Sequence, residues 1–158
     1  MSTAASSVEP IEALRAEFGG CRVLLVEDSD IFATVLGALL EEAGLIVDQA
    51  EHGEQALARM ADEAYSAVLM DVEMPVMDGI EATRRIRASG GAAAEVPIVM
   101  VTAHAMLGDR DRYLAAGAND YIAKPIKPDQ LRETLRRILC PCGKCFNAAT
   151  CAASPCVP

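Results

Sequence analysis

Five polar residues in this sequence stand at the ends of short apolar runs. Glu27 and Asp28 end CRVLLVED, Asp71 ends SAVLMD, Thr102 ends PIVMVT and Lys124 ends NDYIAK. Three converging carboxylates repel one another unless a cation lies between them, and a hard divalent ion such as Mg²⁺ suits that place. A lysine and a hydroxyl beside the ion suit a phosphoryl group, by offsetting its charge and donating a hydrogen bond. Asp71 can then act as a nucleophile toward phosphorus and form an aspartyl phosphate.

The elements that must position these residues follow from the alternation of short apolar runs with longer amphipathic segments. The expected strands cover 21–28, 45–50, 66–71, 97–102 and 119–124, and the expected helices cover about 30–43, 54–63, 79–89, 107–116 and 128–139. Asp30 is expected to cap the first helix. Five strands that each lead into a helix predict an α/β fold with a parallel sheet covered on both faces. Sites in such sheets lie at the carboxyl ends of the strands, so all five polar groups fall on one edge.

Each of these polar residues also has a plainer explanation when taken alone. Glu27 and Asp28 could merely favour a helix N-terminus, Thr102 could cap the next helix, and Lys124 could be a solvated lysine. The coincidence of all five residues at one sheet edge favours a functional site.

Composition and charge limit the kinds of partner. The 23 acidic residues against 14 basic ones give a net charge of −9, which argues against nucleic acid or an anionic membrane as the main partner. The charge-free runs 31–40 and 96–107 are much shorter than the roughly 20 apolar residues of a membrane span. The start MSTAASSVEP lacks the basic and apolar stretches of a signal peptide. We therefore expect a cytoplasmic protein.

Four motifs, VLLVEDS, LMDVEMPVMDG, MVTAHA and DYIAKP, occur in that order between Cys21 and Leu139. With them the chain resembles the receiver domain of two-component response regulators. The stretch from TAHAM to GDRDRYLAAGANDYIAKPI is most similar to receivers of hybrid histidine kinases. The resemblance implies a flavodoxin-like, doubly wound fold with strand order 2-1-3-4-5 and five helices.

The resemblance also implies a reaction. Asp71 would take a phosphoryl group from a phosphohistidine on a histidine kinase or a histidine phosphotransfer domain. Mg²⁺ would be held by Asp28, Asp71 and the backbone carbonyl of Glu73, with Glu27 helping from nearby. Such a domain is a phosphoacceptor in a phosphorelay and not an enzyme, beyond its own phosphorylation and slow autodephosphorylation.

Further roles implied by the resemblance concern the phosphoryl group and the signal that it sends. Thr102 and Lys124 would contact the phosphoryl oxygens, and the Lys124–Pro125 bond would be cis. The switch of the family couples Thr102 to an aromatic residue of the last strand, here Tyr121, although an aromatic residue at such a position is most often part of the core. The region 107–139 would change and contact an output partner.

Other functions have weaker support in the sequence. A haloacid-dehalogenase-like phosphatase expects a second aspartate two residues after the nucleophile, and Glu73 stands there instead. The motifs of nucleotide-binding proteins, zinc proteases and serine hydrolases do not occur. An interaction module that works without phosphorylation stays open as the alternative.

The two ends of the chain extend beyond the motifs. We expect an N-terminal extension or linker over 1–20, the receiver over 21–139, and a cysteine-rich tail over 140–158. The tail spacing C-x-C-x2-C-x5-C-x4-C offers thiols for a metal but lacks the paired C-x2-C arrangement of a strong zinc site. We therefore expect a disordered tail, with metal binding as the lesser alternative.

Overall fold

The three inner strands of this protein are short, mainly aliphatic runs that are buried on both faces. In the computed structural model, which describes residues 20–90, 92–103 and 108–139, β3 (Ala67–Asp71) and β4 (Ile98–Thr102) are buried at every position. The remaining strands are β1 (Arg22–Val26), β2 (Ile46–Ala50) and β5 (Asp120–Ala123). All five pair in parallel in the order β2-β1-β3-β4-β5, which confirms the doubly wound sheet. Continuous burial is expected of a parallel sheet that has helices on both faces.

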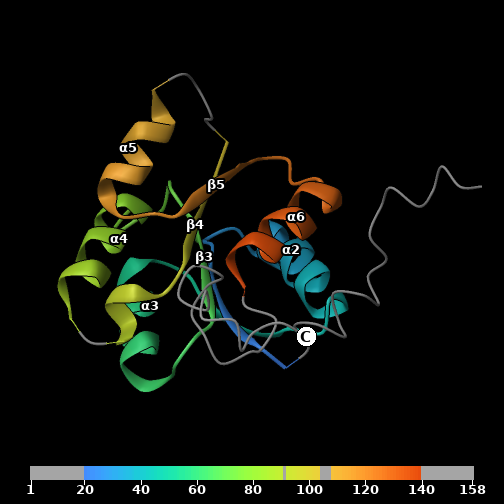
Figure 1. Cartoon of the computed structure of the whole chain (residues 1–158), viewed down its shortest axis with the longest axis horizontal. Helices are drawn as coiled ribbons and strands as arrows, with labels where there is room; N and C mark the ends of the chain where they lie inside the picture. The colour runs from blue at the N-terminus through green and yellow to red at the C-terminus, as the bar shows by residue number, and fades with distance from the viewer. Residues whose placement is uncertain (1–19, 91, 104–107, 140–158) are drawn as a thin grey trace, which may run out of the picture.

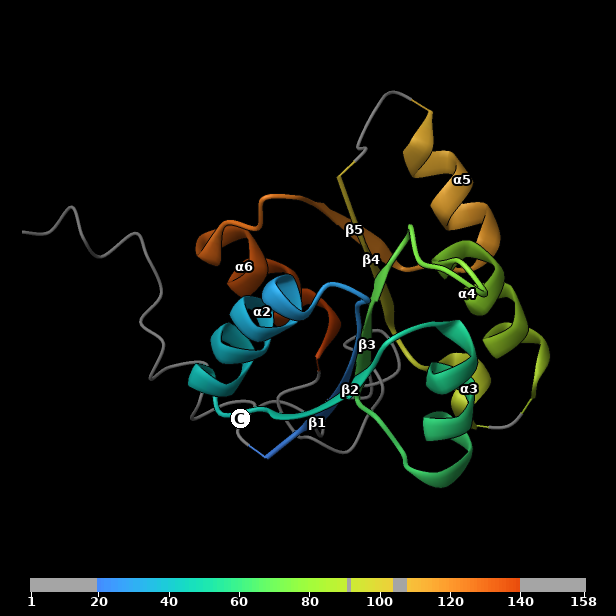
Figure 2. The same ribbon diagram turned by 180° about the vertical axis from the view of Figure 1, so that it is seen from behind.

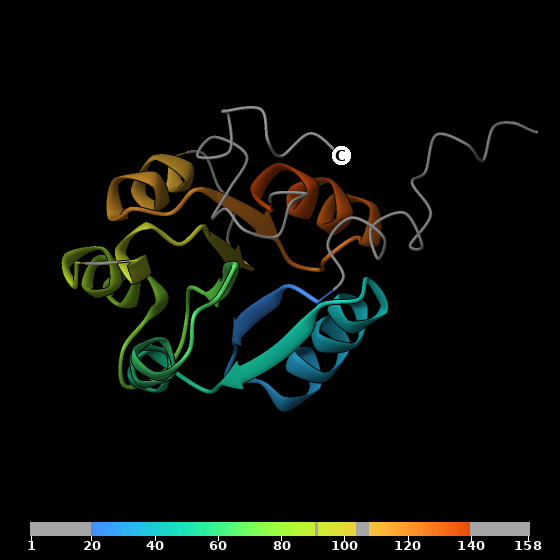
Figure 3. The ribbon, with the colours of Figure 1, turned by 60° about the horizontal axis from the view of Figure 1, so that its bottom comes forward.

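Helices cover the two faces of the sheet unequally (Figure 1). One face carries α2 (Asp30–Glu42) and α6 (Pro128–Ile138), and the other carries α3 (Gly53–Asp62), α4 (Gly79–Ala88) and α5 (Asp109–Ala116). A short 3₁₀ turn, η2 (Ala92–Glu95), precedes β4. The reverse view in Figure 2 and the turned view in Figure 3 show the same two layers with the strands between them. Over the described ranges, no helix has the length and apolar character of a membrane span.

The pleat of the strands divides the core into two hydrophobic clusters. In β1, Val23 and Leu25 belong to the cluster under α2 and α6, which we call the α2/α6 face. Leu24 and Val26 belong to the cluster under α3, α4 and α5, which we call the α3–α5 face. Alternate residues of each strand therefore point to opposite layers, and this decides which layer a functional side chain at a strand end faces.

The elements lie where the sequence predicts them, with ends that differ by one or two residues and with one correction at a helix cap. Ser29, and not Asp30, caps α2, because the Ser29 hydroxyl accepts a hydrogen bond of 3.3 Å from the backbone N–H of Phe32. Asp30 is instead the first helical residue, where its negative charge suits the helix dipole. The expected cis bond between Lys124 and Pro125 is confirmed. The expectations for 1–19 and 140–158 lie outside the described residues.

The start of α4 packs unusually closely on the end of β3. The Gly79 N–H donates a hydrogen bond of 2.8 Å to the carbonyl of Val72. A Cβ atom added to Gly79 would lie 2.2 Å from the backbone oxygen of Asp71, far inside van der Waals contact. Asp78 caps the same helix end by accepting a hydrogen bond of 2.8 Å from the N–H of Glu81. Glycine at position 79 is therefore what allows α4 to begin directly against the backbone of Asp71.

Replacing Gly79 by alanine should lower the free energy of unfolding by about 1–3 kcal/mol, because the new methyl group would clash with the backbone oxygen of Asp71, which cannot move away as a flexible side chain could. Gly37→Ala in α2 is the matched control, since a Cβ there meets its nearest atom, the side-chain nitrogen of Gln49, at 3.4 Å. This control should lose no stability, because alanine favours a helix interior more than glycine does. Urea unfolding of both variants measures the difference. Equal losses would contradict the close packing at Gly79.

Candidate functional site

The carboxyl edge of the sheet brings together charged residues that are far apart in the sequence. Glu27 directly follows β1, Asp71 is the last residue of β3, and Lys124 directly follows β5. The Lys124 ammonium nitrogen lies 3.1 Å from a carboxylate oxygen of Glu27, 97 positions away in the chain. It also lies 3.3 Å from a carboxylate oxygen of Asp71. One lysine thus forms ion pairs with two acids, because the sheet places the carboxyl ends of β1, β3 and β5 at the same edge.

Both acids in this cluster are withdrawn from water. Glu27 and Asp71 are each 4% exposed, and buried charges are strongly unfavourable unless paired or hydrogen-bonded. The second oxygen of Glu27 accepts a hydrogen bond of 3.2 Å from the N–H of Ser29. The Lys124 ammonium also lies 4.2 Å from the centre of the Phe32 ring, a favourable cation–π distance. The first turn of α2 therefore helps to hold both partners in place.

This environment changes the acidity of the central groups. Burial, followed by the negative charge of Glu27, raises the pKa of the Asp71 carboxyl to about 7, against the opposing effect of Lys124. Burial alone would lower the pKa of Lys124. The hydrogen bond with Glu27 and the charge of Asp71 outweigh it and raise the pKa of the ammonium. Lysine therefore stays charged, yet it compensates the two buried acids only in part.

A third carboxylate completes an oxygen cluster that opens to solvent. One carboxylate oxygen from each of Glu27, Asp28 and Asp71 lies within 4.8 Å of the others. Asp28 is exposed, so the cluster can be reached from solution. This arrangement is suited to a hard cation that prefers oxygen ligands. The structure thus brings together all three acids that the sequence predicts at this edge.

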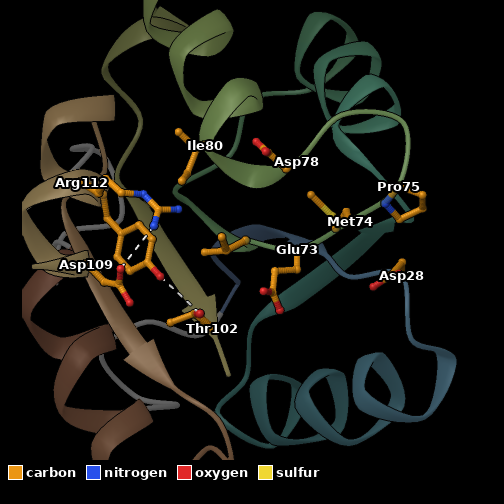
Figure 4. Close-up of a pocket in the computed structure, with 11 residues that line it drawn as sticks. Asp28, Glu73, Met74, Pro75, Asp78, Ile80, Thr102, Asp109 and Arg112 are labelled. Atoms are coloured by element: carbon orange, nitrogen blue, oxygen red, sulfur yellow. Dashed lines mark hydrogen bonds and ion pairs between the residues drawn. The ribbon is translucent and has the colours of Figure 1, made fainter. Parts of the chain in front are cut away.

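A cavity of about 550 Å³ adjoins the acidic cluster (Figure 4). Its lining includes Asp28, Glu73 and Thr102 on the sheet edge, and it extends to Asp109 and Arg112 at the start of α5. Glu73 therefore lines the same cavity as Asp28, beside the acidic cluster.

Thr102 ends β4 and is 1% exposed. Its hydroxyl oxygen accepts a hydrogen bond of 3.3 Å from the hydroxyl of Tyr113 in α5. The ring of Tyr113 in turn lies 5.9 Å from that of Tyr121 in β5. The pairing of Thr102 with Tyr121 stays a prediction, and the contact with Tyr113 is one that the sequence reading missed. The sequence held one indication of this contact. Tyr113 and Ala116 are three positions apart and so share one side of a short helix, and this is the side that is buried in the structure.

Comparison with known proteins identifies the same segment. A family model described as the response regulator receiver domain matches residues 23–136. The rice protein "Two-component response regulator ORR41" is 48% identical over 114 residues, which are 70% of this chain and 87% of that protein. Hybrid signal transduction histidine kinase I of Dictyostelium discoideum is 37% identical over 127 residues, which are 75% of this chain but only 7% of that protein.

Solved structures give the same result. The receiver domain of the sensor histidine kinase PA1611 of Pseudomonas aeruginosa, described with a magnesium ion in its active-site cleft, matches with a TM-score of 0.70 and 44% identity over 75% of this chain and 97% of that one. A co-crystal structure of the Saccharomyces cerevisiae phosphotransfer protein Ypd1 with the receiver domain of Ssk1 matches with a TM-score of 0.69 and 29% identity, over 76% of this chain and 89% of that one. Since sequence and structure agree over the sheet and its five helices, this chain belongs to the response regulator receiver domain family of two-component signalling.

Proposed function

We propose that this chain accepts a phosphoryl group on Asp71 from the phosphohistidine of a histidine kinase or a histidine phosphotransfer protein. The observation that carries the proposal is the ion pair of 3.3 Å between Asp71 and Lys124 at the buried edge of the sheet. In the transfer, a carboxylate oxygen of Asp71 bonds to phosphorus while the phosphorus–nitrogen bond of the donor breaks. The donor imidazole leaves with that electron pair and takes up a proton from solvent.

Lys124 and Thr102 are the groups proposed to receive the phosphoryl oxygens. The Lys124 ammonium already contacts Asp71, so it can offset the charge that arrives with the group. Thr102, at the end of the neighbouring strand β4, supplies a hydroxyl that can donate a hydrogen bond to one oxygen. Ala103, next along the chain, adds little bulk beside the site.

The acidic cluster fits Mg²⁺. Asp28, Asp71 and the backbone carbonyl of Glu73 are the proposed ligands, with Glu27 in support, because three carboxylate oxygens lie within 4.8 Å of one another. Mg²⁺ bound there would supply charge compensation to the carboxylates and to the phosphoryl oxygens. The magnesium ion described for the similar PA1611 receiver supports this assignment.

The proposed unit of function is the stretch 21–139, acting in the cytoplasm as a phosphoacceptor and not as a metabolic enzyme. The matched stretch spans only 7% of the Dictyostelium kinase and 12% of the BarA kinase of Escherichia coli, so receivers of this kind also occur within much longer proteins. The Ypd1–Ssk1 complex supports a phosphotransfer protein as a donor class. The region 107–139 is the proposed surface for an output partner, with Tyr121 as part of the switch.

Phosphorylation should depend on Asp71 alone. With acetyl phosphate and Mg²⁺, the protein should gain the mass of one acid-labile phosphoryl group, and Asp71→Asn should gain none. Asp129→Asn is the matched control, because its side chain is 70% exposed on α6, and it should be labelled like the wild type. Intact-mass spectrometry measures all three. Labelling of Asp71→Asn would exclude this acceptor, and an unlabelled wild type would favour the interaction module that works without phosphate.

Asp28→Asn should raise the melting temperature of the metal-free protein, because it removes one of three mutually repelling carboxylates. Mg²⁺ should reverse the ranking. An ion that binds only the folded state raises the free energy of unfolding by about 2.7 kcal/mol when its concentration is a hundred times its dissociation constant. The wild type should show this gain, and Asp28→Asn should gain far less. Asp30→Asn, which changes an acid outside the cluster, should respond to Mg²⁺ as the wild type does. Melting curves across a magnesium titration decide, and an unaltered response of Asp28→Asn would refute the shared cation site.

Stability of the metal-free protein should fall as pH rises from about 4 to about 7. In this window the folded protein keeps a proton on Asp71, whose pKa is raised from 3.8 to about 7, while the unfolded chain has released it. The stability that this bound proton contributes is fully present below the pKa of Asp71 in the unfolded chain, 3.8. It is lost as the pH rises through the pKa of Asp71 in the folded protein, about 7. Urea unfolding in EDTA should therefore show that the wild type loses stability relative to Asp71→Asn as the pH rises through this window. A difference in free energy of unfolding between the two proteins that does not change with pH would contradict the prediction.

A further inference from the structure

A groove runs between the two helices of the α2/α6 face, which lie next to each other in Figure 2. Its volume is about 150 Å³. It is lined by Leu39, Glu42 and Ala43 of α2 and by Pro128, Leu131, Arg132 and Leu135 of α6. A cavity of about this size with aliphatic walls accepts a benzene ring. The groove is therefore large enough for one aromatic side chain.

The backbone of Gly20 lies beside one end of this groove. The N–H of Gly20 donates a hydrogen bond of 2.9 Å to the carbonyl of Gly44, and Gly44 directly follows the groove residue Ala43. Gly20 has a φ of +88°, a left-handed conformation that lets the chain change direction there. Because each residue spans at most about 3.6 Å, Phe18 lies within about 7 Å of Gly20. The segment before Gly20 can thus reach the groove through a short connection.

The sequence of that segment predicts an amphipathic helix over 10–18. Ile11, Leu14 and Phe18 are three and four positions apart, so they share one side of a helix. Pro10 suits the first position of such a helix, and Gly19 suits the position just after its end. A helix this short is marginal in water by itself. It needs an apolar surface against which its three large side chains can pack.

Charged residues border both the groove and the apolar side of the predicted helix. Glu42 lies on the α2 wall of the groove, and Arg132, which also forms an ion pair with Asp129, lies on the α6 wall. At 3.6 residues per turn, Arg15 and Glu17 fall on opposite flanks of the apolar side of the helix. A base and an acid of the helix can therefore meet an acid and a base of the groove.

We propose that residues 10–18 pack as a helix on the α2/α6 face, with the Phe18 ring in the groove between α2 and α6 and with Leu14 and Ile11 against its walls. The tail 140–158 is a weaker occupant, because its large apolar residues apart from cysteine are Phe146 and Val157, with Pro155 between them. The inference goes beyond the proposed function, since the groove contains none of the residues of the acidic cluster.

The first test uses fluorescence of the full chain, which contains no tryptophan. Phe18→Trp introduces a single indole, whose emission should be shifted to the blue and protected from acrylamide because the ring is withdrawn from water. Ala16→Trp is the matched control, because position 16 lies on the opposite side of the predicted helix. Its emission should be that of an exposed indole.

The second test asks whether the groove is the seat. In the Phe18→Trp protein, Leu39→Gln should shift the emission back to the red. Leu57→Gln should leave it unchanged, because Leu57 is also a partly buried leucine but packs against the cluster of the α3–α5 face. Far-UV circular dichroism checks that each variant is folded.

A third variant changes the predicted helix and leaves the core of the receiver intact. Leu14→Gln in the Phe18→Trp protein should also shift the emission to the red, because glutamine supports a helix but is not apolar. In the wild-type background the same change should lower the melting temperature by about 2–4 °C. Ala16→Gln is the control for both measurements and should change neither.

Three results would overturn the inference. One is an exposed emission of Phe18→Trp equal to that of Ala16→Trp. Another is a blue emission that neither Leu39→Gln nor Leu14→Gln changes, because the ring would then lie elsewhere. A third is a blue emission that is lost on dilution, because a second copy of the chain would then supply the ring. None of these measurements involves phosphate, so their failure would leave Asp71 as the proposed acceptor.

Discussion

The ion pairs of Lys124 with Glu27 and Asp71 are the interaction on which the carboxyl edge of this sheet depends. Two acids that are each 4% exposed lie in a region where charges interact far more strongly than in water. One ammonium cannot neutralise both of them together with Asp28. The folded protein therefore keeps an excess of negative charge at a place that solvent can reach. That excess is the physical basis for binding a cation and, beside it, a phosphoryl group.

Backbone packing makes this concentration of charge possible. The parallel sheet places the ends of β1, β3 and β5 at one edge, and helices on both faces exclude water from the strands. Gly79 adds to this by letting α4 start against the backbone of Asp71, so the loop after β3 is held close to the acid that it follows. The unfavourable charges at the edge are thus held by a core that does not depend on them.

The same edge of the sheet also contacts the helix α5. Strand alternation places Asp71 on the α2/α6 face and Thr102 on the α3–α5 face of the sheet. Tyr113 extends the link from Thr102 into α5, while Arg87 fastens the far end of that helix to the base of β4. Hydrogen bonds of Tyr113 and Arg87 therefore attach α5 to both ends of β4.

Local sequence pattern alone predicted the strands and the helices, because apolar periodicity and helix signals act over a few residues. A parallel sheet then aligns the strand ends at one edge. The polar residues predicted at that edge are Glu27, Asp28, Asp71, Thr102 and Lys124. Adjacent capping residues were harder to separate, and Ser29 took the place predicted for Asp30. Only the tertiary structure decided that Lys124 pairs with both buried acids and that the Thr102 hydroxyl meets Tyr113. These contacts depend on side-chain directions and distances across separate strands and helices, which periodicity within one segment does not encode.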